Sequence, residues 1–183
     1  SGGSFGIKQA IMPMIILTCL ASKLSNKQVI WVEDRLEHLT AASSATGRLT
    51  KLRASINEKG LIEALDYDQI DDVGAYPRAP EPASLYRMHG NLSGAYKVKN
   101  ISCRNRVVLT NKTPSGLNRG FGGPQHYFAL ERLVHQIAVE LNLNVLDVIK
   151  VNLLEKKQFP YKSPSGALLD LSLIHISEPT RLV

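Results

Sequence analysis

The sequence predicts an α+β fold in which locally paired strands pack against helices. Three observations support this class: a helix-like apolar stretch comes early in the chain, segments with period-2 alternation follow, and helical periodicity closes it. Because helices and strands do not alternate one by one, a parallel βαβ arrangement is not expected. The 183 residues, 44% of them hydrophobic, match the length and composition of an ordinary globular domain.

The first predicted element is a buried helix over residues 10–24, entered from the glycine-rich segment 1–9. Pro13 suits its first turn, where the missing N–H has no intrahelical partner to lose. The stretch is shorter than the roughly 20 apolar residues that span a bilayer, so no membrane partner is expected. Residues 29–32, with three β-branched side chains and Trp31, predict a short strand, and the charged residues 33–37 predict a turn.

The middle of the chain predicts a hairpin and a further strand. Basic and apolar residues alternate over 48–56, and residues 61–70 alternate again, as half-buried strands do. The turn formers Asn-Glu-Lys-Gly at 57–60 join the two strands. Residues 74–84 contain three prolines and predict a loop, and residues 98–110 predict another strand.

Two helices are predicted near the end. A glycine- and proline-punctuated loop at 111–124 leads directly into a helix with Pro124 at its first position. Asn144 is expected to cap a further short helix that ends at Leu154. Apolar residues recur at helical spacing in the first of these helices: Phe128, Leu130, Val134, Ile137, Ala138 and Leu141.

Charge and cysteine content restrict the partners only loosely. The net charge of +6 suits nucleic acid, an anionic cofactor or no specific partner. Cys19 and Cys103 form no C-x-x-C unit, so neither a zinc site nor an iron–sulfur cluster is predicted. Two distant thiols in a domain of this size indicate a reducing compartment, and we expect a cytoplasmic protein.

Two glycine-rich motifs are the candidate sites. Residues 2–9 (GGSFGIKQ) let backbone N–H groups approach an anionic group, and Lys8 adds charge. Their spacing matches neither the Walker nor the Rossmann pattern, and taken alone a turn before a helix is the simpler interpretation. Residues 118–125 (NRGFGGPQ) place Arg119 and Phe121 directly before a helix N-terminus, which suits an anion or an oxo group. A loop in which Phe121 caps the core explains the second motif equally well.

Taken together in order, five segments resemble the molybdenum-binding subunit of the xanthine dehydrogenase and aldehyde oxidase family. They are GGSFGIK, WVEDRLEHL, RLTKLRASINEKGLIEALDYDQIDDVGAYP, TNKTPSGLNRGFGGPQ and QFPY. The resemblance covers Gly2 to about Gly166, and it implies that residues 1–170 are the first part of a molybdopterin-binding domain in a much longer subunit. Residues 171–183 contain LSLIHISEPTR, which resembles the translation of a transposase sequencing adapter, so we expect a tail rather than a domain.

The resemblance also implies roles for individual residues. It implies that Gln9, Arg87 and Phe121 contact the substrate. The metal is implied to be held by the pterin dithiolene and by oxo or sulfido ligands, with no side chain bonded to it. No catalytic residue is expected in this chain, because the family's general-base glutamate lies later in the subunit. The implied cofactor-binding residues are Gly3, Ser4, Phe5, Gly6, Arg119 and Gly120.

The implied function is oxidoreductase chemistry. The subunit would hydroxylate a carbon of an aldehyde or N-heterocycle with water as the oxygen source, using molybdenum-molybdopterin, of which a dinucleotide form is one option. Partner subunits or domains would carry [2Fe–2S] clusters and FAD, and the 183 residues alone are expected to be inactive. The alternative is a basic, non-catalytic binding module for nucleic acid or an acidic partner. The paired motifs with Arg119 and Phe121 argue against it, because such a module needs neither.

Three departures from the family pattern bear on the substrate. Purine-oxidising members carry Glu where this chain has Gln9, and a neutral amide offers a different set of hydrogen-bond donors and acceptors. Asn118 replaces a common aromatic residue, which makes that wall more polar. Gly120 stands where carbon monoxide dehydrogenases have a catalytic cysteine. Xanthine and carbon monoxide are therefore disfavoured as substrates.

Overall fold

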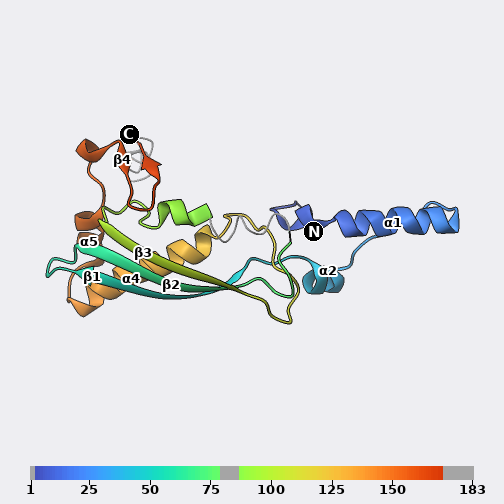
Figure 1. The fold of residues 1–183 in the computed structure, drawn as a ribbon, viewed down its shortest axis with the longest axis horizontal. Helices are drawn as coiled ribbons and strands as arrows, with labels where there is room; N and C mark the ends of the chain where they lie inside the picture. Colours follow the sequence, from blue (N-terminus) through green and yellow to red (C-terminus); the bar gives the residue numbers. More distant parts are fainter. Residues whose placement is uncertain (1–2, 79–86, 171–183) are drawn as a thin grey trace, which may run out of the picture. The chain divides into compact units, whose positions relative to one another are not determined.

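The computed structural model describes residues 3–78 and 87–170, without the side chains of Gln9, Ala10 and Arg87. Its helices and two small sheets confirm the predicted α+β class (Figure 1). The elements are, in order, η1 (Ile7–Ala10), α1 (Met12–Ser25), α2 (Arg35–Ala41), β1 (Gly47–Ile56), β2 (Ile62–Asp72), η2 (Arg87–Asn91), β3 (Asn100–Val108), α4 (Gly123–Glu140), α5 (Val145–Asn152), η3 (Lys156–Gln158), β4 (Tyr161–Lys162) and β5 (Leu168–Leu169).

The chain divides into two compact units, each built from segments that are far apart in the sequence. Unit 1 comprises Ser1–Arg48, Asp71–Tyr86 and Val107–Gly122. Unit 2 comprises Leu49–Ile70, Arg87–Arg106 and Gly123–Val183.

The strands of unit 2 form the predicted hairpin and extend it. β1 and β2 are neighbours in the sheet, and β3 lies on the other side of β2. The side chain of Asn57 accepts hydrogen bonds from the N–H groups of Lys59 and Leu61, which closes the turn between the strands. Burial alternates along β2, as the period-2 pattern predicts.

The core of unit 2 lies between β2 and the helices that follow. Figure 1 shows α4 running along one face of the sheet. The ring of Tyr67 on β2 lies 5.4 Å from that of His126 in the first turn of α4, and both residues are fully buried. Phe128 departs from the expected apolar face of α4, because its side chain is 75% exposed. The buried apolar residues of this core are Ile62, Leu65, Tyr67, Leu92, Tyr96, Val98, Leu130, Val134, Ile137, Ala138 and Val148.

The short helix α5 is tied to the hairpin by one buried side chain. Asn144 caps α5 as predicted, accepting from the N–H of Leu146, but the helix ends at Asn152 rather than at Leu154. Asn152 accepts from the N–H of Ile62 and donates to the carbonyl of Gly60, each at 2.8 Å. These bonds satisfy backbone groups that would otherwise be buried without a partner.

Two predictions for unit 1 are wrong. Residues 29–32 form no strand: no described strand pairs with them, and a β-branched run without a neighbour gains no ladder hydrogen bonds. Residues 33–37 are not a simple turn, because Asp34 and Glu37 form a capping box that starts α2.

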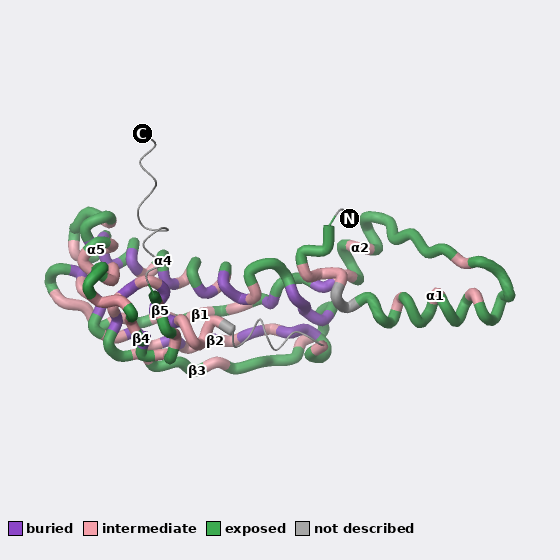
Figure 2. The backbone as a smooth tube through the Cα atoms, turned by 90° about the horizontal axis from the view of Figure 1, so that it is seen from above, coloured by how far each residue is buried: buried purple, intermediate pink, exposed green. Residues whose placement is uncertain are grey.

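Helix α1 corrects a third prediction. It forms close to the expected residues, with Pro13 in its first turn, but none of its residues is buried. Figure 2 shows its tube in the colours of exposed and half-buried residues. No helix within residues 3–78 and 87–170 combines the length and apolar character needed to cross a membrane. Both cysteines, at positions 19 and 103, are free and exposed.

Unit 1 contains a buried ion pair. Arg48 at the start of β1 binds Asp71 near the end of β2 through two hydrogen bonds of 2.7 and 2.9 Å. Only 3% of the arginine side chain and none of the aspartate side chain are exposed. Val73 and Leu117 are buried apolar residues of this unit. Most of the predicted loop 74–84 and the whole tail 171–183 lie outside the described residues.

Candidate functional site

The two glycine-rich motifs meet in unit 1. The backbone N–H of Arg119 donates to the carbonyl oxygen of Phe5 at 2.9 Å, although 114 positions separate them along the chain. The same N–H lies 2.8 Å from Oδ1 of Asn118. A Cβ atom placed on Gly6 would lie 2.8 Å from the carbonyl oxygen of Leu117, so the two backbones touch. We call residues 3–6 the first loop and residues 118–122 the second loop.

Both loops have backbone conformations that most residues avoid. Phe5 has a φ of 50° and Phe121 a φ of 46°, and a bulky residue in this left-handed region is strained. Such strain costs roughly 1–3 kcal/mol per residue, and it persists only where the surroundings enforce it. Both phenylalanines are flanked by positive-φ glycines, and the four glycines of the two loops with this conformation are Gly3, Gly6, Gly120 and Gly122.

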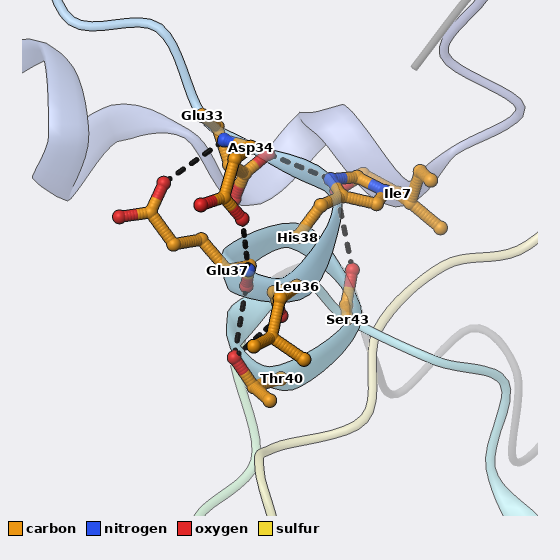
Figure 3. Close-up of polar contacts among 8 residues, drawn as sticks. All are labelled: Ile7, Glu33, Asp34, Leu36, Glu37, His38, Thr40 and Ser43. Carbon is orange, nitrogen blue, oxygen red and sulfur yellow. Dashed lines mark hydrogen bonds and ion pairs between the residues drawn. The ribbon is translucent and has the colours of Figure 1, made fainter.

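Small residues behind the loops hold them together. Ser43, just after α2, is buried and donates from its hydroxyl to the carbonyl of Ile7 at 3.2 Å (Figure 3). A Cβ on Gly116 would lie 2.5 Å from Cβ of Ser43, and the N–H of Gly116 donates to the carbonyl of Ser44. Sequence reasoning did not identify these residues. The signal was the run of small residues at 41–47, which allows close backbone approach.

Helix α2 carries a polar group beside this support. Nδ1 of His38 lies 2.7 Å from a carboxylate oxygen of Glu33, and both side chains are partly exposed. Figure 3 shows the pair next to the Asp34–Glu37 capping box. The histidine is thus satisfied locally, as expected for a histidine without metal-ligand spacing.

The exposed faces of the two loops suit an anionic, acceptor-rich ligand. Ser4, Arg119 and Gly120 are exposed, and Phe5 is 58% exposed. No acidic residue occurs in residues 1–32 or 111–123, whereas Lys8 and Arg119 are cationic. A guanidinium, a serine hydroxyl and loop N–H groups donate hydrogen bonds to phosphate, carbonyl and ring-nitrogen acceptors. This donor set, beside two aromatic rings, fits an organic cofactor that carries phosphate.

The structure brings together most of the predicted site residues. The cofactor-binding candidates Gly3, Ser4, Phe5 and Gly6 lie on the first loop, and Arg119, Gly120 and Phe121 lie on the second. Phe121 is half-buried. The backbone of Gln9 lies in η1, directly after the first loop, and that of Arg87 lies in η2 in unit 2. The side chains of Gln9 and Arg87 lie outside the described part. Among the described residues, no cluster of His, Cys, Asp or Glu could hold a metal ion.

Some basic residues outside the loops form ion pairs. Arg53 binds Asp66, and Arg106 binds Asp68, both on the sheet surface. The Lys112 ammonium beside Asp72, together with the Thr110 hydroxyl and the Gly74 N–H, lowers the pKa of the Asp72 carboxyl to about 2. These three basic side chains are therefore paired with carboxylates.

Comparisons with known proteins identify the family. The model of the molybdopterin cofactor-binding domain matches residues 1–153. This chain belongs to that family. It is 31% identical over 160 residues to the 6-hydroxypseudooxynicotine dehydrogenase complex subunit gamma of Paenarthrobacter nicotinovorans, covering 87% of this chain and 20% of that protein. It is 29% identical over 180 residues to the carbon monoxide dehydrogenase large chain of Hydrogenophaga pseudoflava, covering 95% of this chain and 22% of that protein.

A solved structure gives the same result at the level of the fold. The quinoline 2-oxidoreductase of Pseudomonas putida 86 superposes on this molybdopterin cofactor-binding domain with a TM-score of 0.84 and 31% sequence identity. The superposition covers 92% of this chain and 22% of that chain. The chain therefore spans about a fifth of the length of the relatives it matches.

Proposed function

We propose that residues 1–170 are the first part of the molybdopterin-binding domain in the large subunit of a molybdenum hydroxylase, and that residues 171–183 are a tail outside it. The complete subunit hydroxylates a carbon of an aldehyde or an N-heterocycle and takes the oxygen from water. Family membership supports the cofactor class. The single observation that carries the site is the hydrogen bond from the N–H of Arg119 to the carbonyl of Phe5.

The cofactor lies against the joined loops. Bound there, the molybdenum group supplies the redox chemistry and activates water, as bound metal ions do. Ser4 and Arg119 hold its acceptor atoms with a hydroxyl and a guanidinium, and the exposed Phe5 ring packs beside it. Gly3, Gly6 and Gly120 allow the positive φ values with which the loops present backbone N–H groups to it. The positive φ values match this role, since strained loop conformations concentrate at ligand sites.

The substrate occupies the neighbouring space. Phe121 offers an aromatic face against which a flat heterocycle stacks, and Gln9 supplies a polar contact. The amide of Gln9 is neutral and both donates and accepts, so it recognises a ring nitrogen or a carbonyl without demanding a proton. Quinoline, named for one structural relative, is a flat N-heterocycle. A general base is still needed to remove a proton, and a residue of the subunit outside these 183 provides it.

The holoenzyme includes other chains. Relatives are named as a complex subunit and a large chain. We propose that this subunit likewise assembles in the cytoplasm with [2Fe–2S] and FAD partners that carry electrons away from the molybdenum.

The experiment uses the full-length gene that contains this sequence. The purified complex is analysed for molybdenum and pterin, and dye reduction is followed with aldehydes and N-heterocycles. We expect the substitution Arg119→Ala to lower molybdenum content by about 10–100-fold, the range for losing a group that supports a metal site. Arg132→Ala, at an exposed arginine on α4, is the matched control and retains the cofactor. Wild-type protein without molybdenum, or an Arg119→Ala variant with normal content, refutes the proposal.

A further inference from the structure

Helix α1 has an unusual surface for the outside of a protein. Its 14 residues include only one charged side chain, Lys23, and none of the 14 is buried. A helix that is apolar on all sides normally lies in the interior of a large protein. Its exposed apolar residues are Met12, Ile15, Ile16, Leu17, Leu20 and Leu24.

The apolar surface continues beyond the helix. Ile30 and Val32 in the following segment are 77% and 81% exposed, and Leu36 and Leu39 on α2 are each 71% exposed. Monomeric soluble proteins rarely expose contiguous apolar patches larger than a few hundred Å². Together these residues form a surface that requires a partner.

One side of α1 lines a cavity within unit 1. The cavity has a volume of about 450 Å³, and Ile11, Met14 and Ile15 contribute to its wall. Trp31 and the His38–Glu33 pair line it from the following segment and from α2. The cavity wall is thus mainly apolar, and it also includes the cationic residues Lys8 and Arg78.

A small molecule in this cavity would leave most of the apolar surface uncovered. Ile11, Ile15 and Thr18 follow the spacing of one helix face, and they line the cavity. Ile16, Leu20 and Leu24 recur every fourth residue on another face and do not line it. Only a partner of protein size covers both faces, so a bound metabolite does not explain the helix.

The charge pattern indicates what the partner carries. Residues 1–32 contain three lysines, Lys8, Lys23 and Lys27, and no acidic residue. Lys23 lies in the last turn of α1, and Lys27 follows the helix, which ends at Ser25. An apolar segment that also carries carboxylates complements this surface, because carboxylates would pair with these ammonium groups.

We infer that the apolar surface of α1 and the cavity beside it are filled by another part of the same polypeptide, an apolar segment with acidic side chains outside residues 1–183. The inference rests on the proposed function, in which this chain is about a fifth of a larger subunit. It goes beyond that function because it assigns α1 to the interior of the complete subunit. A covering segment from the same chain needs no encounter between molecules, so α1 is never exposed once the subunit folds.

Cys19 provides a direct test. It lies on α1, lines the cavity and is exposed in this structure. The full-length protein with Cys103→Ser is treated with iodoacetamide, and labelling of the Cys19 peptide is followed by mass spectrometry. We expect labelling at least about tenfold slower than in urea, because thiol reactivity depends on exposure. Equal rates in the native and the unfolded protein refute the inference.

The other possible occupants give different results. Protection of Cys19 that disappears on dilution points to a second copy, and protection that needs anionic lipid vesicles points to a membrane surface. Either outcome overturns the inference.

Molybdenum content is measured in the same preparation. A protein with molybdenum and an open Cys19 refutes this inference alone, whereas a protected Cys19 without molybdenum refutes only the proposed function.

A pair of substitutions gives a second readout. Leu24→Glu in the full-length protein places a carboxylate at the apolar face, and we expect loss of soluble protein or a clearly lower Tm. Ser25→Glu makes the same change at the adjacent exposed polar position and is the matched control. Equal stability of the two variants contradicts a buried α1.

Discussion

The contact between the two loops can be tested by adding a single methyl group. Gly6 has a φ of +98°, and a Cβ atom at this position would lie 2.8 Å from the carbonyl oxygen of Leu117. Gly166 has nearly the same φ, +101°, but nothing lies within 4 Å of its Cβ position. Comparing Gly6→Ala with Gly166→Ala therefore separates the effect of the close approach from that of the backbone conformation.

The expected magnitudes follow from these two environments. Both substitutions place an alanine in a left-handed conformation, which costs about 1–2 kcal/mol. Gly6→Ala also forces a carbon into a backbone oxygen, and overpacking of this kind adds about 1–3 kcal/mol. The oxygen belongs to the backbone and cannot rotate away, so we expect the first loop to separate from the second.

Hydrogen exchange measured by mass spectrometry reports this separation. In Gly6→Ala, peptides covering residues 115–122 are expected to exchange at least about tenfold faster, which corresponds to 1.4 kcal/mol. In Gly166→Ala, the same peptides keep their native exchange rates. Unchanged exchange near Arg119 in Gly6→Ala would show that the loops do not depend on this contact, and would refute the reasoning.

Three further predictions concern the polar contacts of the fold. Asp71→Asn removes the carboxylate that pairs with the buried guanidinium of Arg48, and we expect the free energy of unfolding to fall by about 3–5 kcal/mol. The double change Arg48→Met with Asp71→Leu removes both charges and is expected to be nearly neutral in urea unfolding. Because the Asp72 pKa falls from its ordinary 3.8 to about 2, the carboxylate stabilises the fold above about pH 4, and this contribution is lost as the pH falls toward 2. Acid titration of Lys112→Ala, which removes the main partner of Asp72, should show a smaller stability change across that range, and an identical profile would contradict the assignment. Asn152→Ala leaves the Gly60 carbonyl and the Ile62 N–H buried without the partner that Asn152 provides, and we expect a lower free energy of unfolding. A loss of less than about 1 kcal/mol in urea unfolding would argue against the importance of these two bonds.

Features that depend on neighbouring residues were predictable. The hairpin followed from alternation on both sides of the Asn57–Gly60 turn, and the structure shows both strands. The cap of α5 by Asn144 followed from one residue type at one position. The start of α2 is equally accessible from the sequence, because Asp34 and Glu37 have the spacing of a capping box, although the density of charge in residues 33–37 also favours a turn.

Features that depend on distant partners were not predictable in the same way. Residues 29–32 have the composition of a strand, but no described strand pairs with them. Helix α1 has the composition of a buried helix, but its partner is not among the described residues. In both segments the local composition predicts the element, but strand pairing and burial also require a distant partner, which local composition does not specify.

The sequence by itself determined the α+β class, the hairpin, the closing helices and, through the order of five motif segments, the family. Each of these depends on spacing within a few residues or on motif order, both of which are visible without coordinates. Only the tertiary structure decided that the Phe5 and Arg119 backbones join, that Ser43 and Gly116 support them, and that α1 exposes its apolar surface. These contacts link segments up to 114 positions apart, and nothing in the local residue pattern specifies which distant backbone approaches which.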